Sequence, residues 1–181
     1  MKDLSLHILD IAQNSLSADA NNIDIEVVEN TNKNLLTIAI KDDGKGMPEH
    51  VIERVTDPYF TSRKTRKVGM GLPLFKQNAE TAGGGLHIES QVGRGTTVKA
   101  TFLHSHLDRP PMGDIAGVVI ILVSSNPTVE WTYTHIKDGE KYVFDTREVR
   151  SALDDIPLND LKIGKYLKEM IQENLADIGA Q

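Results

Sequence analysis

The apolar residues of the first hundred positions follow two different periods, and each period predicts a type of element. Between residues 3 and 18 they recur at helical spacing on more than one face, which indicates a helix packed on two sides. Strict alternation at 23–27 and 36–40 predicts two strands. Helical spacing returns from Leu72 to about Ala82, and alternation over 86–102 predicts a hairpin. The pattern therefore predicts a mixed domain of helices and strands.

A second set of elements follows a polar stretch that contains two consecutive prolines. This stretch, His104 to Asp114, is expected to link an N-terminal domain of residues 1–103 to a C-terminal extension of residues 115–181. The elements expected in the extension are a buried strand at 117–123, strands of a hairpin at 129–136 and 141–144, a short helix at 147–155, and a helix that Asn159 caps and that runs to about Ala176. We expect the extension to pack on the same sheet or to form a dimer interface.

Charge and composition narrow the class of protein. The 181 residues carry a formal net charge of −6, which argues against a general binder of nucleic acid or anionic membrane. The chain has no cysteine, so disulfides and thiolate metal sites are excluded, and a cytoplasmic location is expected. No apolar run is long enough to span a bilayer. We therefore expect neither a nucleic-acid nor a membrane partner.

Asp42 occupies an inward-facing position at the end of the second predicted strand. It shares strand parity with Leu36, Ile38 and Ile40, the apolar residues that should face the core. A carboxylate in such a place is costly unless a donor pairs with it, and the amino group of a ligand would serve. Asp42 is therefore a candidate for direct recognition of a ligand.

Two glycines, Gly69 and Gly71, precede the helix expected from Leu72. A helix N-terminus presents unpaired N–H groups and a partial positive charge, and glycines let an anion approach closely. A basic run lies just upstream, at residues 63–67. This combination predicts a phosphate-binding site.

Five motifs occur in one order along the chain: Asn14 on the first helix, Asp42-x-Gly44-x-Gly46 after a strand, the basic loop, Gly69-x-Gly71 before a helix, and Gly93-Arg94-Gly95-Thr96-Thr97. Together they resemble the ATP-binding module of the gyrase, chaperone, histidine kinase and MutL (GHKL) superfamily, over roughly residues 1–103. The resemblance implies the Bergerat fold, an α+β fold in which a two-layer α/β sandwich has helices covering one face of a mixed, mostly antiparallel sheet. It also implies ATP and Mg²⁺ as cofactors.

The resemblance assigns roles to the matching residues. Asp42 resembles the Asp that accepts a hydrogen bond from the adenine amino group, and Asn14 resembles the Asn that ligates Mg²⁺ through its side-chain oxygen. The other nucleotide contacts that it implies are Gly44, Gly46 and Met47 near the adenine, Gly69, Met70, Gly71 and Leu72 beneath the phosphates, and Thr97 or Thr96 as the Thr that supports Asp42.

Two of the motifs favour the histidine kinase branch. The segment Pro58–Arg63 resembles the kinase box Pro-Phe-Phe-Thr-Thr-Lys, and Gly69–Leu72 resembles its Gly-x-Gly-Leu. The resemblance implies that Arg63 or Lys64 reaches the ATP phosphates. Residues 56–68 would then form a lid that closes over the triphosphate.

Asp10 lies one helical turn before Asn14, on the same face of the first predicted helix. The segment Asp10–Ala18 resembles the MutL box, with Asp10 where a catalytic Glu stands. Asp10 would then act as a general base toward water or a substrate hydroxyl. The alternative is that Asp10 is a solvated or capping residue without a chemical role.

Two functions stay open at this point. Full histidine kinases carry a phospho-accepting His on a helical hairpin before the ATP module, and no such hairpin precedes the first predicted helix. The first function is therefore a stand-alone kinase that passes the γ-phosphate of ATP to a His or Ser of a partner protein, as in two-component and related regulatory systems. The second is an ATP-gated interaction module with slow or no hydrolysis, acting on a partner or as a homodimer.

Overall fold

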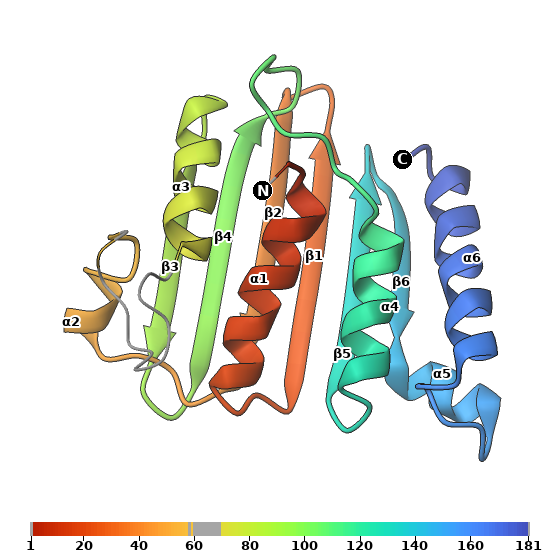
Figure 1. The fold of residues 1–181 in the computed structure, drawn as a ribbon. Coiled ribbons are helices and arrows are strands. Elements are labelled where there is room, and N and C mark those ends of the chain that lie inside the picture. Colours follow the sequence, from red (N-terminus) through yellow and green to blue (C-terminus); the bar gives the residue numbers. More distant parts are fainter. Residues whose placement is uncertain (1, 58, 60–69, 181) are drawn as a thin grey trace.

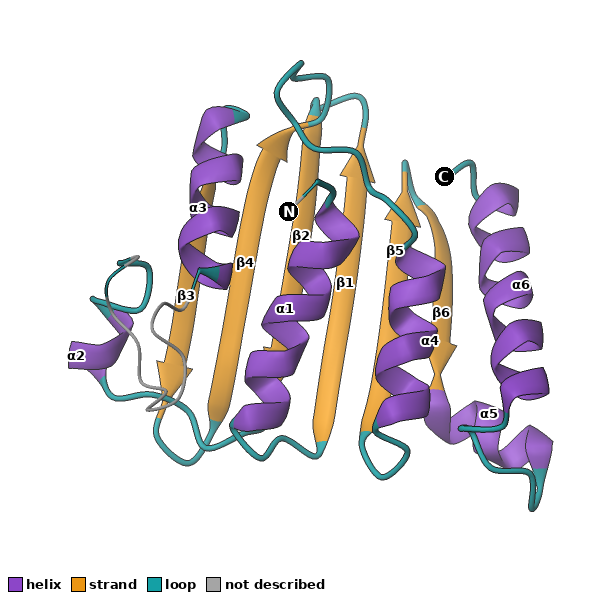
Figure 2. Cartoon of the chain, viewed as in Figure 1, coloured by secondary structure: helices purple, strands orange, loops and turns teal. Residues whose placement is uncertain are grey.

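The computed structural model describes residues 2–57, 59 and 70–180, and these form one six-stranded sheet with helices on a single face. The strands stand in the order β3-β4-β2-β1-β5-β6. Their bounds are β1 Asn22–Asn30, β2 Leu35–Asp42, β3 Gly85–Gln91, β4 Gly95–Leu103, β5 Glu130–Lys137 and β6 Glu140–Asp145. The helices are α1 Leu4–Ser17, α2 Glu49–Ile52, α3 Gly71–Thr81, α4 Ile115–Ser125, α5 Thr146–Leu153 and α6 Leu161–Asp177. Figures 1 and 2 show α1, α3, α4 and α6 side by side over the sheet. The expected two-layer α/β sandwich is confirmed.

The core lies between this helical layer and the sheet. β1 and β2 pair antiparallel with Ile25 opposite Ile40 and Val27 opposite Ile38, and all four side chains are buried. The alternating polar residues of the same strands face the other side of the sheet, where no helix of the described residues lies. Strict alternation in sequence thus places one apolar face against α1 and α3, as the period of two requires.

The C-terminal extension continues the same sheet. β5 pairs parallel with β1, with Trp131 opposite Ile23 and Tyr133 opposite Ile25, and both aromatic side chains are buried. α4 packs between α1 and α6 over these strands. Of the two arrangements expected for the extension, the structure therefore has the shared sheet.

The expectation of a strand at 117–123 is wrong, because this run lies in helix α4. The side chain of Asp114 caps the helix by accepting from the N–H of Gly117 at 2.9 Å. Residues 115–119, 122 and 123 are buried between the sheet, α1 and α6, so the helix is apolar on nearly all sides. A short, continuous apolar run has no period to separate a strand from a buried helix. A smaller correction concerns α6, whose N-cap is Asp160 rather than Asn159.

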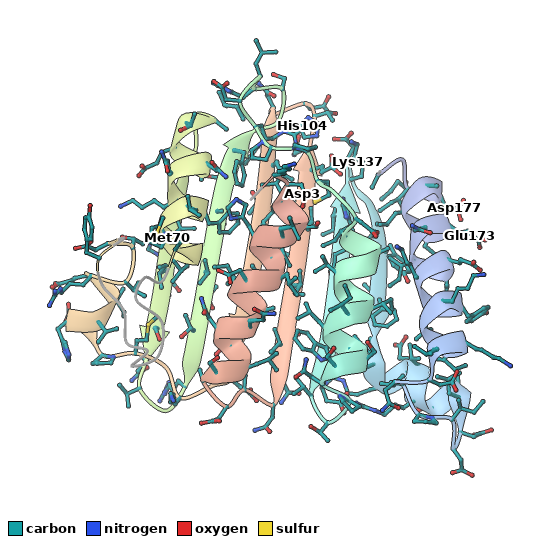
Figure 3. The ribbon with its side chains drawn as sticks, in the orientation of Figure 1. Asp3, Met70, His104, Lys137, Glu173 and Asp177 are labelled. Carbon is teal, nitrogen blue, oxygen red and sulfur yellow. The ribbon has the colours of Figure 1, made fainter. Side chains whose placement is uncertain are left out.

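A partly buried polar cluster joins the extension to the N-terminal segment at the end of β1. We call it the Glu29 cluster: Tyr133, His135 and Lys137 on β5, Glu29 on β1, and His104 just after β4. The carboxylate of Glu29 is 2.8 Å from Nε2 of both His135 and His104, and it accepts from Nζ of Lys137 at 2.9 Å. Figure 3 labels His104 and Lys137 close together at this end of the sheet.

Candidate nucleotide site

Asp42 lies at the end of β2 with its side chain turned under α1, and it is only 7% exposed. One carboxylate oxygen, Oδ1, accepts from the backbone N–H of Gly44 at 2.9 Å and from that of Thr96 at 3.2 Å. The other, Oδ2, accepts from the hydroxyl of Ser15 at 2.5 Å. Three donors therefore offset the cost of burying this carboxylate and hold it in one orientation.

Close backbone contacts account for the glycines around Asp42. A Cβ on Gly46, whose φ is +69°, would clash with the main chain of Gln91, and one on Gly44 would lie 2.7 Å from the carbonyl oxygen of Ala18. Gly95, with a φ of +107°, would clash with the main chain of Asp42 itself. These three glycines therefore let three loops of the protein meet at the end of the sheet. The implied place of Gly44 and Gly46 near the adenine stays a prediction.

Met47 is attached to the same end of the sheet through Ser90. The N–H of Met47 donates to the Ser90 hydroxyl at 2.8 Å, and that hydroxyl donates to the carbonyl oxygen of Gly95 at 3.0 Å. Ser90 thus ties the segment after Gly46 to both strands of the β3–β4 hairpin.

The structure separates the two threonines that the resemblance left as alternatives. Thr96 is the register partner of Asp42 and shares parity with the buried Val98 and Ala100, whereas Thr97 pairs with Lys41. Alternation along β4 therefore directs the Thr97 side chain to the helix-free face of the sheet, away from Asp42. Thr97 does not fit the supporting role, and Thr96 takes its place beside Asp42. The Thr96 hydroxyl lies 2.8 Å from that of Ser90.

Helix α1 supplies the other polar residues of the site. Asp10 and Asn14 are half-buried and one turn apart, and Ser15 follows Asn14 directly. The carboxylate of Asp10 lies against Gly71, so closely that a Cβ at Gly71 would clash with Oδ2. The first residue of α3 is therefore in contact with the α1 residue that the sequence proposed as a general base.

The N-terminus of α3 lies next to this carboxylate. Met70 is the N-cap residue, is 42% exposed and offers the helix no side-chain hydrogen bond, while Leu72 is buried. Backbone N–H groups at such a helix start carry partial positive charge. A shallow hollow beside them is lined by Leu6, Leu9, Asp10 and Gln13 of α1. Arg63, Lys64 and Gly69 lie outside the described residues.

The Mg²⁺ that the family resemblance implies has one candidate ligand among the described residues, Asn14. No group of three or more His, Asp or Glu side chains among them is arranged to hold a metal ion. Mg²⁺ is commonly held by one or two protein ligands together with substrate phosphates and waters. Asn14, one residue from the Asp42 partner Ser15, is a suitable single oxygen ligand of that kind.

His7, the one histidine of α1, is a core residue. Its ring is fully buried, stacks on Phe75 at a centroid distance of 5.0 Å and lies 2.7 Å from Nδ2 of Asn78. Burial lowers the pKa of His7 to about 4, so the ring is neutral at pH 7. Such a ring has no access to a phosphate donor.

The fold and the order of these motifs agree with comparisons to known proteins. Residues 2–106, more than half of the chain, match the family model of the histidine kinase-, DNA gyrase B- and HSP90-like ATPases. The chain therefore belongs to this family and carries a histidine kinase-like ATPase domain. Within the described residues, no helix has the length and apolar character needed to cross a membrane.

Relatives by sequence are sensor kinases. The chain is 28% identical to sporulation kinase A of Bacillus subtilis over 102 residues, which cover 56% of this chain and 16% of that protein. It is 32% identical to the sensor histidine kinase WalK of the same organism over 108 residues, covering 55% of this chain and 18% of that one. The chain thus spans less than a fifth of the length of these relatives.

Solved structures share the fold. The ATPase domain of Aquifex aeolicus MutL, complexed with ADP, superposes with a TM-score of 0.53 at 18% identity, covering 94% of this chain and 70% of that one. The N-terminal domain of a DNA repair protein gives 0.59 at 14% identity, with 99% and 57% covered. Both alignments extend well beyond the 2–106 segment, so the fold likeness includes the C-terminal extension.

Proposed function

We propose that this chain binds Mg²⁺-ATP and acts as a stand-alone kinase, transferring the γ-phosphate to a partner protein of a regulatory system. The observation that carries the nucleotide site is the buried Asp42 carboxylate, which three donors orient at the end of β2. Sensor kinases among the relatives and an ADP complex among the structural neighbours support the same assignment.

Each part of the site has a role in this proposal. Asp42 reads the adenine amino group and Asn14 holds Mg²⁺ through its side-chain oxygen. The N-terminus of α3 at Gly71 and Leu72 receives the phosphates, with Gly69, Arg63 and Lys64 of the preceding segment. Bound Mg²⁺ would neutralise charge on the triphosphate, and the chain's own contribution is to position it.

The phosphoacceptor is proposed to be a His or Ser on a separate protein. Of the described histidines, His7 is buried and neutral, so it is a poor acceptor. We propose a cytoplasmic location for this kinase.

Nucleotide binding is tested by titrating the purified chain with a fluorescent ATP analogue, with and without Mg²⁺. Asp42→Asn should weaken binding by at least about tenfold, because an amide presents one acceptor where the carboxylate presents two. Asp24→Asn makes the same charge change on the helix-free face of β1 and should leave binding unchanged. Equal affinity in the wild type and the Asp42 variant would contradict the site.

A second function is an ATP-gated interaction module, and the contact between Asp10 and Gly71 favours it. This contact puts a carboxylate at the start of α3, where a general base would activate water for slow hydrolysis. The fate of γ-labelled phosphate separates the two functions. Label on a protein supports the kinase, whereas free phosphate or retained ATP supports the module. Asp10→Asn should retain binding and abolish phosphate release if Asp10 is the base.

A further inference from the structure

Helix α6 carries its charges in the order that its own dipole disfavours. Lys162, Lys165 and Lys168 lie in its N-terminal half, and Glu173 and Asp177 lie in its C-terminal half. The first turn of the helix holds no acidic residue and the last turn holds no basic one. The N-cap residue Asp160 places a favourable carboxylate at the N-terminus, but the charges within the helix run in the order that the dipole disfavours, because the N-terminus is partially positive and the C-terminus partially negative.

Most of these charges have no ion-pair partner among the residues that the structure describes. Lys168 pairs with Asp114, Nζ to Oδ2 at 2.6 Å. Among the described residues, Lys162, Lys165, Glu169, Glu173 and Asp177 form no ion pair. All five are exposed, and Glu173 and Asp177 lie toward the C-terminal end of α6 on the side of the molecule away from α3 (Figure 3).

The exposed charges share one face of α6 with two large apolar side chains. Leu167, Ile171 and Leu175 form the buried face, and the helix contacts α4 and β6. On the outer face, Leu161 is 91% exposed and Tyr166 is 61% exposed. Exposed aromatic rings such as that of Tyr166 are enriched at protein interfaces, and charged side chains occur at their polar rims.

We propose that the outer face of α6 binds a second copy of this chain, with the two helices antiparallel about a two-fold axis. In that arrangement Lys162 and Lys165 of one protomer lie opposite Glu173 and Asp177 of the other, and symmetry repeats the pairing. A parallel arrangement would place like charges together. Because each end of this face carries charges of one sign, the face is self-complementary when two copies pair antiparallel.

The size of the outer face of α6 determines how tightly two copies are expected to associate. A 17-residue helix is about 25 Å long, and one helix pair buries less than the roughly 800 Å² per partner of a standard interface. Glu169 lies midway along α6, so the two-fold axis brings it near Glu169 of the second copy. Repulsion between these two carboxylates weakens the dimer. We expect dissociation constants of about 10–100 µM.

Sedimentation velocity on the full chain at 10–500 µM and 0.1 M NaCl tests the proposal, with circular dichroism to confirm folding. The wild type should dimerise, and K162E/K165E should be monomeric with at least a tenfold weaker association. Its control, K33E/K141E, makes the same change in net charge at exposed turn and β6 positions and should dimerise like the wild type.

The decisive variant exchanges both ends. The variant K162E/K165E/E173K/D177K exchanges the charges of the two ends and keeps the net charge of −6. Opposite charges again face each other in the antiparallel pair, so dimerisation should return to the wild-type level. Recovery supports the antiparallel pairing. A wild type that stays monomeric at 500 µM, a dimer that ignores K162E/K165E, or an exchanged chain that stays monomeric would each overturn it. A monomeric wild type would leave this face to solvent or to a different protein.

Discussion

The hydroxyl of Ser15 donates a 2.5 Å hydrogen bond to Oδ2 of Asp42, and this bond connects the last turn of α1 to the end of β2. The two groups are 27 positions apart in sequence and buried in the fold. Ser15 therefore helps to set the direction in which the carboxylate presents its remaining acceptor capacity.

Removing this hydroxyl is expected to weaken nucleotide binding without abolishing it. Ser15→Ala should raise the dissociation constant of ATP by about tenfold or more, because a hydrogen bond to a charged group contributes about 1.5–3 kcal/mol. Ser17→Ala, two positions along α1 at an exposed site, is the matched control. Affinity equal to that of the wild type in both variants would show that Gly44 and Thr96 suffice to orient Asp42.

Gly46 should tolerate no side chain, whereas Gly93 should tolerate one at moderate cost. Both have positive φ, +69° and +78°, but a Cβ on Gly46 meets the main chain of Gln91 and one on Gly93 meets nothing within 4 Å. Gly46→Ala is expected to lower the free energy of unfolding by about 3 kcal/mol or more, and Gly93→Ala by about 1–2 kcal/mol. Urea denaturation measures both, and equal losses would contradict the close approach of the two loops.

Glu29 should make folding stability sensitive to acid. Burial raises the pKa of its carboxyl group, but hydrogen bonds from His135, His104 and Lys137 outweigh burial and the net pKa is far below the ordinary value of 4.5. A carboxyl with a lowered folded pKa contributes stability above its unfolded pKa, and the contribution is lost as the pH falls below about 4.5.

The substitution that tests this cluster is Glu29→Gln. It leaves His135, His104 and Lys137 without the carboxylate that they contact. We expect a loss of about 2–4 kcal/mol at pH 7, measured by urea denaturation, and a flatter stability profile below pH 4.5. Glu26→Gln, on the exposed face of the same strand, should change stability by less than about 0.5 kcal/mol. A Glu29 variant as stable as the wild type would mean that the cluster contributes no net stability.

His7 should produce a second acid-sensitive step at higher pH. Burial lowers its pKa to about 4, against the ordinary value of 6.5, so the unfolded chain binds a proton in this range and the folded chain does not. Stability should therefore fall by about 2–3 kcal/mol as the pH drops from about 6.5 to about 4. In His7→Gln the step between pH 6.5 and 5 should vanish, while the exposed control His50→Gln should retain it.

Local periodicity was enough to predict the elements that build the nucleotide site. Alternation placed Asp42 on the core side of β2, and its burial confirms that prediction. The same rule of alternation selects Thr96 over Thr97 once the register of β2 and β4 is known. The sequence alone does not determine that register. The roles of Asp10, Asn14 and the α3 glycines in binding and catalysis stay predictions.

The remaining features depend on contacts between distant residues. Nothing marks Ser15 in sequence, because a serine on a helix usually faces solvent and its partner belongs to another element. Glu29 and His135 are 106 positions apart, so their contact exists only once β1 and β5 pair. The run at 117–123 forms a helix and not the predicted strand. Its residues are uniformly apolar, so the sequence shows no helical period there.

The parallel pairing of β1 with β5 limits how this chain can be divided. The family model ends at residue 106, but a fragment truncated there would leave β1 as an edge strand that pairs only with β2, with the backbone donors and acceptors of its other side facing solvent. The truncation would also remove α4 and β5 and so expose the apolar side chains that these two elements cover. We therefore expect a fragment that ends at residue 106 to be less stable and more prone to aggregation than the chain that contains both segments.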